Sequence, residues 1–152
     1  MTRTALITGS TSGIGLGIAI EFAKAKYNIV FNGLEPNGAE IAENIGKQYG
    51  IQTLFFPANM LKVDELKDMV DKSIEKFGAV DVLICNAGIQ FVSPIDEFPA
   101  EKWDAIIGIN LTSAFHLTKA VWRKMKEQKF GRRINIASAH GGVAEEFKSA
   151  YV

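Results

Sequence analysis

The segment Thr8–Gly15 is the part of the chain whose residue types and spacing best suit binding chemistry. It has glycine at positions 9, 13 and 15 among small polar residues. Such glycines permit a tight turn and let backbone N–H groups approach a phosphate, and a helix that begins there adds the positive end of its dipole. Glycines also simply end strands, so the segment indicates a phosphate site only if a strand precedes it and a helix follows. The apolar run Thr4–Ile7 and the amphipathic stretch after the turn meet that condition.

The end of the next apolar run, Asn32–Glu35, bears on which dinucleotide would fit. About twenty residues after such a turn, a carboxylate binds the ribose 2'-hydroxyl, whereas an arginine accommodates a 2'-phosphate. Neither Lys nor Arg lies between Asn28 and Gly38, so we infer NAD rather than NADP. Asn32 is a candidate polar contact to the ribose. Glu35 either contacts the ribose or is a solvated loop residue.

Strands and helices that alternate along the chain must position these residues, a pattern typical of a parallel sheet with helical crossovers. The predicted strands are Thr4–Ile7, Ile29–Phe31, Thr53–Phe56, Val80–Ile84 and Arg133–Ile136. The predicted helices are Gly15–Lys26, Ala39–Tyr49, Val63–Phe77 and one long helix over Pro99–Lys129. Right-handed crossovers that reverse direction after the third strand give the order 3-2-1-4-5. We therefore predict an α/β fold, the N-terminal part of a Rossmann-like doubly wound parallel sheet, with strand five at an exposed apolar edge.

Length and composition indicate one domain over residues 1–152. The 17 basic and 17 acidic residues balance, so no overall field would attract nucleic acid or an anionic membrane, and we expect neither partner. No apolar run is long enough to span a membrane. Cys85 is the single cysteine, which excludes an internal disulfide and favours a cytoplasmic location. We predict no metal site.

Several motifs in their order resemble the short-chain dehydrogenase/reductase family over essentially the whole chain. The glycine turn is similar to its TGxxxGIG motif, and Cys85-Asn86-Ala87-Gly88 is close to its NNAG motif. Asn110, Ser138 and Tyr151 follow in the family's order. Each could separately be a cap, a strand end or a half-buried aromatic, but together they favour the family. The resemblance implies cofactor contacts by Gly9, Thr11, Ser12, Gly13, Ile14, Gly15, Asn32, Asn59, Met60, Asn86, Ala87 and Gly88.

The resemblance also implies catalytic roles. In the family, the residue matching Tyr151 exchanges a proton with the reacting oxygen, Ser138 hydrogen-bonds that oxygen, and Asn110 holds a water in a proton relay. A phenol with a pKa near ~10 needs neighbouring positive charge to act as a base. The family supplies it from a lysine four residues after the tyrosine, which here lies beyond Val152. We therefore expect a chain truncated just after its catalytic tyrosine and lacking the C-terminal strands.

The sequence segments Gly9–Ala19, Asn86–Gln90 and Ile134–Gly141 are similar to those of the 3-hydroxybutyrate dehydrogenase group within the family. That likeness implies that Gln90, His140 and Lys148 bind a substrate carboxylate, and their amide, ring and ammonium hydrogens suit an anion. We expect NAD-dependent oxidation of D-3-hydroxybutyrate, a small hydroxy acid, to acetoacetate. A 3-ketoacyl reductase and a sugar-alcohol dehydrogenase are the alternatives within the family. A non-catalytic NAD-binding remnant and a chain that does not fold stably are the others. The family usually forms homotetramers, which is doubtful for so short a chain.

Five residues depart from the family pattern. Asn59 replaces an aspartate that accepts the adenine amino group, and Cys85 replaces the first asparagine of NNAG. Arg133 enters strand five, where it either is buried at a cost or reaches solvent. Glu145 and Glu146 adjoin the expected carboxylate site, where they either oppose an anionic substrate or face away.

Overall fold

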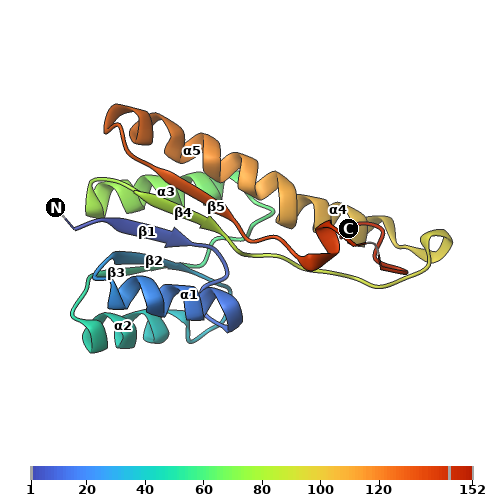
Figure 1. The fold of residues 1–152 in the computed structure, drawn as a ribbon, viewed down its shortest axis with the longest axis horizontal. Helices are drawn as coiled ribbons and strands as arrows, with labels where there is room; N and C mark the ends of the chain where they lie inside the picture. Colours follow the sequence, from blue (N-terminus) through green and yellow to red (C-terminus); the bar gives the residue numbers. More distant parts are fainter. Residues whose placement is uncertain (1, 144, 152) are drawn as a thin grey trace.

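A computed structural model describes residues 2–143 and 145–151, and five parallel strands form one sheet in its centre (Figure 1). The strands are β1 Thr4–Ile7, β2 Asn28–Asn32, β3 Thr53–Phe56, β4 Val82–Cys85 and β5 Arg132–Asn135. Their order is β3-β2-β1-β4-β5, with β1 pairing β2 from Thr4↔Asn28 onward and β4 from Ala5↔Val82 onward. The predicted α/β class and strand order are confirmed.

Helices cover both faces of the sheet. They are α1 Gly13–Lys24, α2 Gly38–Tyr49, α3 Val63–Phe77, α4 Ala100–Ile107 and α5 Ser113–Glu127. Shorter 3-10 turns are η1 Ile95–Glu97 and η3 Ala139–Gly141, and η2 Gly108–Thr112 is a π-helical turn. In Figure 1, α1 and α2 lie on one face, and α3 and α5 lie on the other. This is the layering expected when each crossover is a helix.

The two faces of the sheet bury separate apolar clusters. In β1, Leu6 packs toward α3 and α5, whereas its neighbours Ala5 and Ile7 pack toward α1 and α2. Successive side chains of a strand point to opposite faces, so a strand buried on both sides is a continuous apolar run. All of β1 is buried, which places the turn that follows it at the centre of the sheet's C-terminal edge.

The predicted helix over Pro99–Lys129 is wrong as one regular element. The structure divides it into α4 and α5, with the π-helical turn η2 between them. Within η2, the carboxamide of Asn110 accepts from the Ile89 N–H at 2.9 Å and donates to the Ile89 carbonyl at 2.8 Å. The helical periodicity of the sequence continues through this turn. The contact with Ile89 comes from a segment distant in sequence, so the local pattern does not reveal the turn. Single π turns are frequent at functional sites.

After β5, the C-terminal segment continues beside the loop that follows β4 (Figure 1). The Ser93 N–H donates to the Phe147 carbonyl at 2.8 Å and joins the two segments. All four residues of β5 are exposed, as predicted for an edge strand. Arg133 is also exposed and donates to the Thr118 hydroxyl at 3.3 Å, so it reaches solvent instead of being buried. Apolar side chains on this edge are exposed too, including Ile134.

Candidate active site

The glycine turn between β1 and α1 adopts a backbone that side chains would hinder. Gly9 and Gly13 have φ values of +62° and +52°, in the left-handed region that favours glycine. A Cβ at Gly15 would lie 2.1 Å from the Gly9 carbonyl oxygen. The glycines therefore allow the start of α1 to press directly against the turn.

Asn86, at the end of β4, clamps the turn in place. Its side-chain amide donates to the carbonyls of Thr8 at 3.0 Å and Gly9 at 3.2 Å. The Thr8 hydroxyl in turn accepts from the backbone N–H groups of Asn86 and Ala87, both at 3.0 Å. The NNAG-like segment thus holds the first turn of the sheet against the fourth strand.

Asn32, at the end of β2, supports the turn from the other side. Its side-chain amide donates to the carbonyls of Phe56 and Ala58, both at 3.0 Å, and its oxygen accepts from the Gly9 N–H at 3.2 Å. The residue is 2% exposed. Its polar side-chain atoms therefore already bond backbone groups and hold three loops together. Asn32 has no free side-chain donor left for a ribose.

A cavity of about 680 Å³ opens beside these contacts, which we call the glycine-turn cavity. Its lining residues are Gly9, Ser12, Gly13, Ile14, Gly15, Asn32, Gly33, Leu34, Glu35, Ala58, Asn59, Met60, Asn86, Ala87, Gly88, Ile89 and Ile109. Every predicted cofactor residue except Thr11 is among them. Ser12, the N-cap of α1, makes no side-chain cap hydrogen bond, so the first N–H groups of the helix keep no side-chain partner there. The volume and this helix terminus fit an anionic dinucleotide.

Glu35 faces the glycine turn and belongs to this cavity, although the sequence left its role open. Its carboxylate accepts hydrogen bonds from the hydroxyls of Thr11 and, at 3.3 Å, Ser12. The Thr11 hydrogen bond is the main cause of a pKa lowered from the usual value of a glutamate. Thr11 is itself buried, so its contribution to the cavity is to orient Glu35. The sequence signal was present, because an acidic residue follows the second strand at the distance expected of a ribose contact.

Asn59 and Met60 line the far end of the same cavity. The Asn59 side-chain oxygen accepts from the Leu61 N–H at 2.9 Å, and its own N–H donates to Glu65 at 2.8 Å. The loop before α3 is therefore fixed by local hydrogen bonds. The carbonyl-type oxygen of Asn59 has a second lone pair for a further donor.

A second cavity of about 580 Å³ adjoins the first, and we call it the tyrosine cavity. Its lining residues are Ile14, Cys85, Asn86, Ala87, Gly88, Ile89, Gln90, Asn110, Leu111, Ala114, Asn135, Ile136, Ala137, Ser138, Gly141 and Tyr151. The predicted catalytic residues Asn110, Ser138 and Tyr151 therefore share one cavity with Gln90. Residues from Asn86 to Ile89 line both cavities, so a ligand in one would lie against a ligand in the other.

The ends of β5 and the C-terminal segment place the reactive side chains. Ser138 precedes η3, and its hydroxyl oxygen accepts from the His140 N–H at 3.3 Å. Tyr151 is half-buried, and its N–H donates to the Lys148 carbonyl at 2.9 Å. The rings of His140 and Tyr151 pack edge to face with 6.2 Å between centroids.

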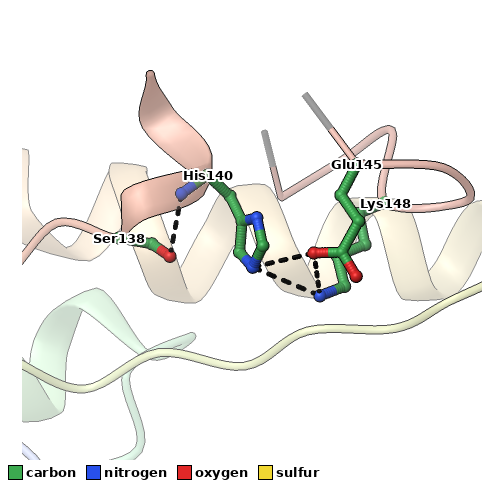
Figure 2. A network of polar contacts seen from close by, with 4 residues as sticks. All are labelled: Ser138, His140, Glu145 and Lys148. Atoms are coloured by element: carbon green, nitrogen blue, oxygen red, sulfur yellow. Dashed lines mark hydrogen bonds and ion pairs between the residues drawn. The ribbon is translucent and has the colours of Figure 1, made fainter. Parts of the chain in front are cut away.

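The predicted carboxylate-binding residues are only partly brought together. Gln90 lines the tyrosine cavity, whereas His140 and Lys148 lie outside its lining. They meet each other, with Lys148 Nζ 3.4 Å from His140 Nε2. Figure 2 shows Glu145 between them, with one carboxylate oxygen 2.9 Å from His140 Nε2 and 2.7 Å from Lys148 Nζ. Glu145 therefore faces the predicted donors directly, whereas the sequence left its orientation open.

Cys85 lines the tyrosine cavity as a neutral thiol. Burial raises its pKa to about 11, and the charge of Arg133 lowers it by less. A thiol in such an environment is a weak nucleophile. Within residues 2–143 and 145–151, no group of three or more His, Cys, Asp or Glu residues could hold a metal ion. No helix in that part of the chain is long and apolar enough to cross a membrane.

Comparison with known proteins agrees with this arrangement. The family model for short chain dehydrogenases matches residues 3–152. The chain belongs to the short-chain dehydrogenase family. It is 51% identical over 157 residues to the D-beta-hydroxybutyrate dehydrogenase of Rhizobium meliloti (strain 1021), with 100% of this chain and 60% of the relative covered. A D-beta-hydroxybutyrate dehydrogenase of Cupriavidus necator is also 51% identical, with 99% of this chain and 58% of the relative covered.

More distant members of the family include reductases. The 3-oxoacyl-(acyl-carrier-protein) reductase of Staphylococcus epidermidis is 34% identical over 100% of this chain and 63% of its own length. The structure of an alcohol dehydrogenase from the archaeon Thermococcus sibiricus, complexed with 5-hydroxy-NADP, superposes with a TM-score of 0.93. At 24% identity, over 99% of this chain and 64% of that one, this likeness supports the fold. The chain thus spans about three-fifths of the length of these relatives.

Proposed function

We propose that this member of the short-chain dehydrogenase family serves the NAD-dependent oxidation of D-3-hydroxybutyrate to acetoacetate. The observation that carries the proposal is the tyrosine cavity, in which Ser138, Tyr151, Asn110 and Gln90 meet beside the glycine-turn cavity. One cavity has the volume and the helix terminus to hold a dinucleotide, and the other has the hydroxyl groups to contact an alcohol. Hydride transfer requires these two ligands in contact.

The proposed cofactor is NAD. Glu35 lines the glycine-turn cavity as an ionised carboxylate held by Thr11 and Ser12. A carboxylate there can accept a hydrogen bond from a ribose 2'-hydroxyl, and it would repel a 2'-phosphate. The glycine turn and the start of α1 would hold the pyrophosphate, and Asn32 and Asn86 would keep that turn in shape.

In the proposed reaction, Tyr151 accepts the proton of the substrate hydroxyl while Ser138 hydrogen-bonds the same oxygen. A bound NAD would supply the acceptor for the hydride that leaves the carbinol carbon. The tyrosine must be ionised for this step, and its phenolate requires adjacent positive charge. Asn110 is fixed by its pair of bonds to Ile89 and would order the water of a proton relay.

The proposed substrate class is a short 3-hydroxy acid. Support comes from Gln90 in the tyrosine cavity and from His140, whose ring packs against Tyr151. The relatives named D-beta-hydroxybutyrate dehydrogenase, 51% identical to this chain, favour the same class. A 3-oxoacyl reductase activity is the second candidate, because members named for it cover the whole chain at 34% identity.

The test compares the rates of three reactions: D-3-hydroxybutyrate with NAD, a sugar alcohol with NAD, and a 3-oxoacyl thioester with NADPH. It uses the 152-residue chain and the same chain continued by the C-terminal part of the Rhizobium relative, which supplies the family's lysine position. We expect the first reaction to be fastest in the continued chain. A faster thioester reaction would replace this proposal with the reductase, and a faster sugar-alcohol reaction would remove the assigned substrate class.

A further inference from the structure

One carboxylate of the chain already contacts two of the three donors assigned to the substrate, His140 and Lys148. The same oxygen of Glu145 lies 2.7 Å from Lys148 Nζ and 2.9 Å from His140 Nε2 (Figure 2). This is the geometry in which a lysine and a histidine would hold the carboxylate of a small hydroxy acid. The chain therefore supplies its own anion to two of the donors assigned to the substrate carboxylate.

The donors cannot serve both carboxylates in full. His140 Nε2 carries at most one hydrogen, which points to one acceptor at a time. The Lys148 side chain is 12% exposed, so it has little access to water apart from this contact. A second carboxylate beside Glu145 would also meet its negative charge at close range. Binding of an acid through both His140 and Lys148 thus requires that Glu145 leave.

Glu145 is free to leave, because its side chain is 46% exposed and lies in a turn-rich segment at the surface. Its hydrogen bond from Lys148 is the main cause of a pKa lowered from the usual value of a glutamate. The carboxylate is therefore ionised at neutral pH, and the pair that it forms with Lys148 has no net charge.

We propose that Glu145 is an internal competitor that occupies His140 and Lys148 in place of the substrate carboxylate and must swing to solvent when an acid binds. The inference rests on the proposed function, since it concerns the same carboxylate-binding donors. It predicts that Glu145 weakens the binding of 3-hydroxy acids and leaves the binding of their neutral esters unchanged. If the unoccupied donors are populated about 10–30% of the time, the apparent Kd is about three- to tenfold higher than that of the empty site.

The experiment measures D-3-hydroxybutyrate binding by calorimetry in the presence of NADH, a combination that cannot react. The chain is compared with its Glu145→Gln, Glu146→Gln and Lys148→Met variants, and each is also titrated with methyl 3-hydroxybutyrate. Glu146 is the matched control, since it carries the same charge one position along and is exposed. The ring-proton NMR signals of His140 are followed during each titration. The signals of His116 serve as the reference, because the chain has 2 histidines.

We expect Glu145→Gln to tighten acid binding by about three- to tenfold and to leave ester binding unchanged. Glu146→Gln should alter acid binding by less than about twofold, as for an exposed surface charge. Equal tightening by both variants would overturn the inference, because net charge would then explain the effect. Unchanged acid binding in Glu145→Gln, with weaker binding in Lys148→Met, would overturn the inference and leave the carboxylate site standing. Equal binding of acid and ester by the chain, unaltered in Lys148→Met, would remove the carboxylate site itself.

Discussion

Substituting Gly15 by Ala tests how closely the start of α1 packs against the glycine turn. A Cβ at this position would lie 2.1 Å from the Gly9 carbonyl oxygen and 2.6 Å from the side-chain nitrogen of Asn86. The first neighbour is backbone in a turn held by hydrogen bonds from two directions, so it cannot move aside easily. The new methyl group must therefore displace α1 from the turn or break the Asn86 clamp.

The magnitude follows from two opposing terms. Overpacking a rigid site costs about 1–3 kcal/mol, and a backbone clash belongs at the upper end of that range. Replacing a helical glycine by alanine returns roughly 1 kcal/mol of helix propensity. We therefore expect Gly15→Ala to lower the free energy of unfolding by about 2 kcal/mol. Because the displaced N–H groups are those proposed to bind the pyrophosphate, NAD binding should be lost as well.

Gly17 provides a matched control in the same helix. A Cβ there meets no atom within 4 Å, so Gly17→Ala should gain the propensity term alone and raise the free energy of unfolding by about 0.5–1 kcal/mol. Both variants are measured by urea denaturation followed by circular dichroism, and NAD binding is measured by calorimetry. A Gly15→Ala chain as stable as Gly17→Ala, with NAD binding retained, would refute the described turn.

Three further predictions concern other residues of the two cavities. Asn32→Asp keeps the side-chain shape but places a carboxylate against the carbonyls of Phe56 and Ala58. The substitution should lower the free energy of unfolding by about 3 kcal/mol in the urea assay. Loss of NAD binding without a change in stability would instead make Asn32 a cofactor contact. Glu35→Arg should shift the ratio of NADP affinity to NAD affinity by at least about tenfold toward NADP. Equal affinities for NAD and NADP in the unsubstituted chain would contradict the role given to Glu35. Burial raises the pKa of Cys85 to about 11. Its thiol should therefore react with iodoacetamide at pH 8 on the order of 100-fold more slowly in the folded chain than in urea. Equal rates would contradict its burial.

Much of the fold follows from local patterns. The helix α3 begins at Val63 and ends at Phe77 as predicted, because its amphipathic pattern is regular and Gly78 ends it in a left-handed conformation. The strand order follows from crossover handedness and from a single reversal. The π-helical turn around Asn110 was missed, because it is distinguished by a pairing with Ile89 that no local pattern records.

The site was predicted as a set of residues but not as a set of contacts. Asn32 and Glu35 were both candidates for the ribose, and burial separates them: the polar atoms of Asn32 are taken by backbone, and Glu35 faces the cavity. For Glu145 the sequence indicated only a charge near the carboxylate site. Whether such a charge repels a substrate or replaces it depends on its distance from His140 and Lys148, which a sequence does not contain.

The rate of NADH formation from D-3-hydroxybutyrate in a Tyr151→Phe chain tests the central proposal most directly. The rate is compared in the chain continued by the C-terminal part of the Rhizobium relative, with and without the substitution. NAD binding by both proteins is measured by calorimetry. We predict that Tyr151→Phe abolishes NADH formation and leaves NAD affinity within about twofold, because the hydroxyl acts only on the proton of the substrate. NADH formation that persists in Tyr151→Phe would contradict the account.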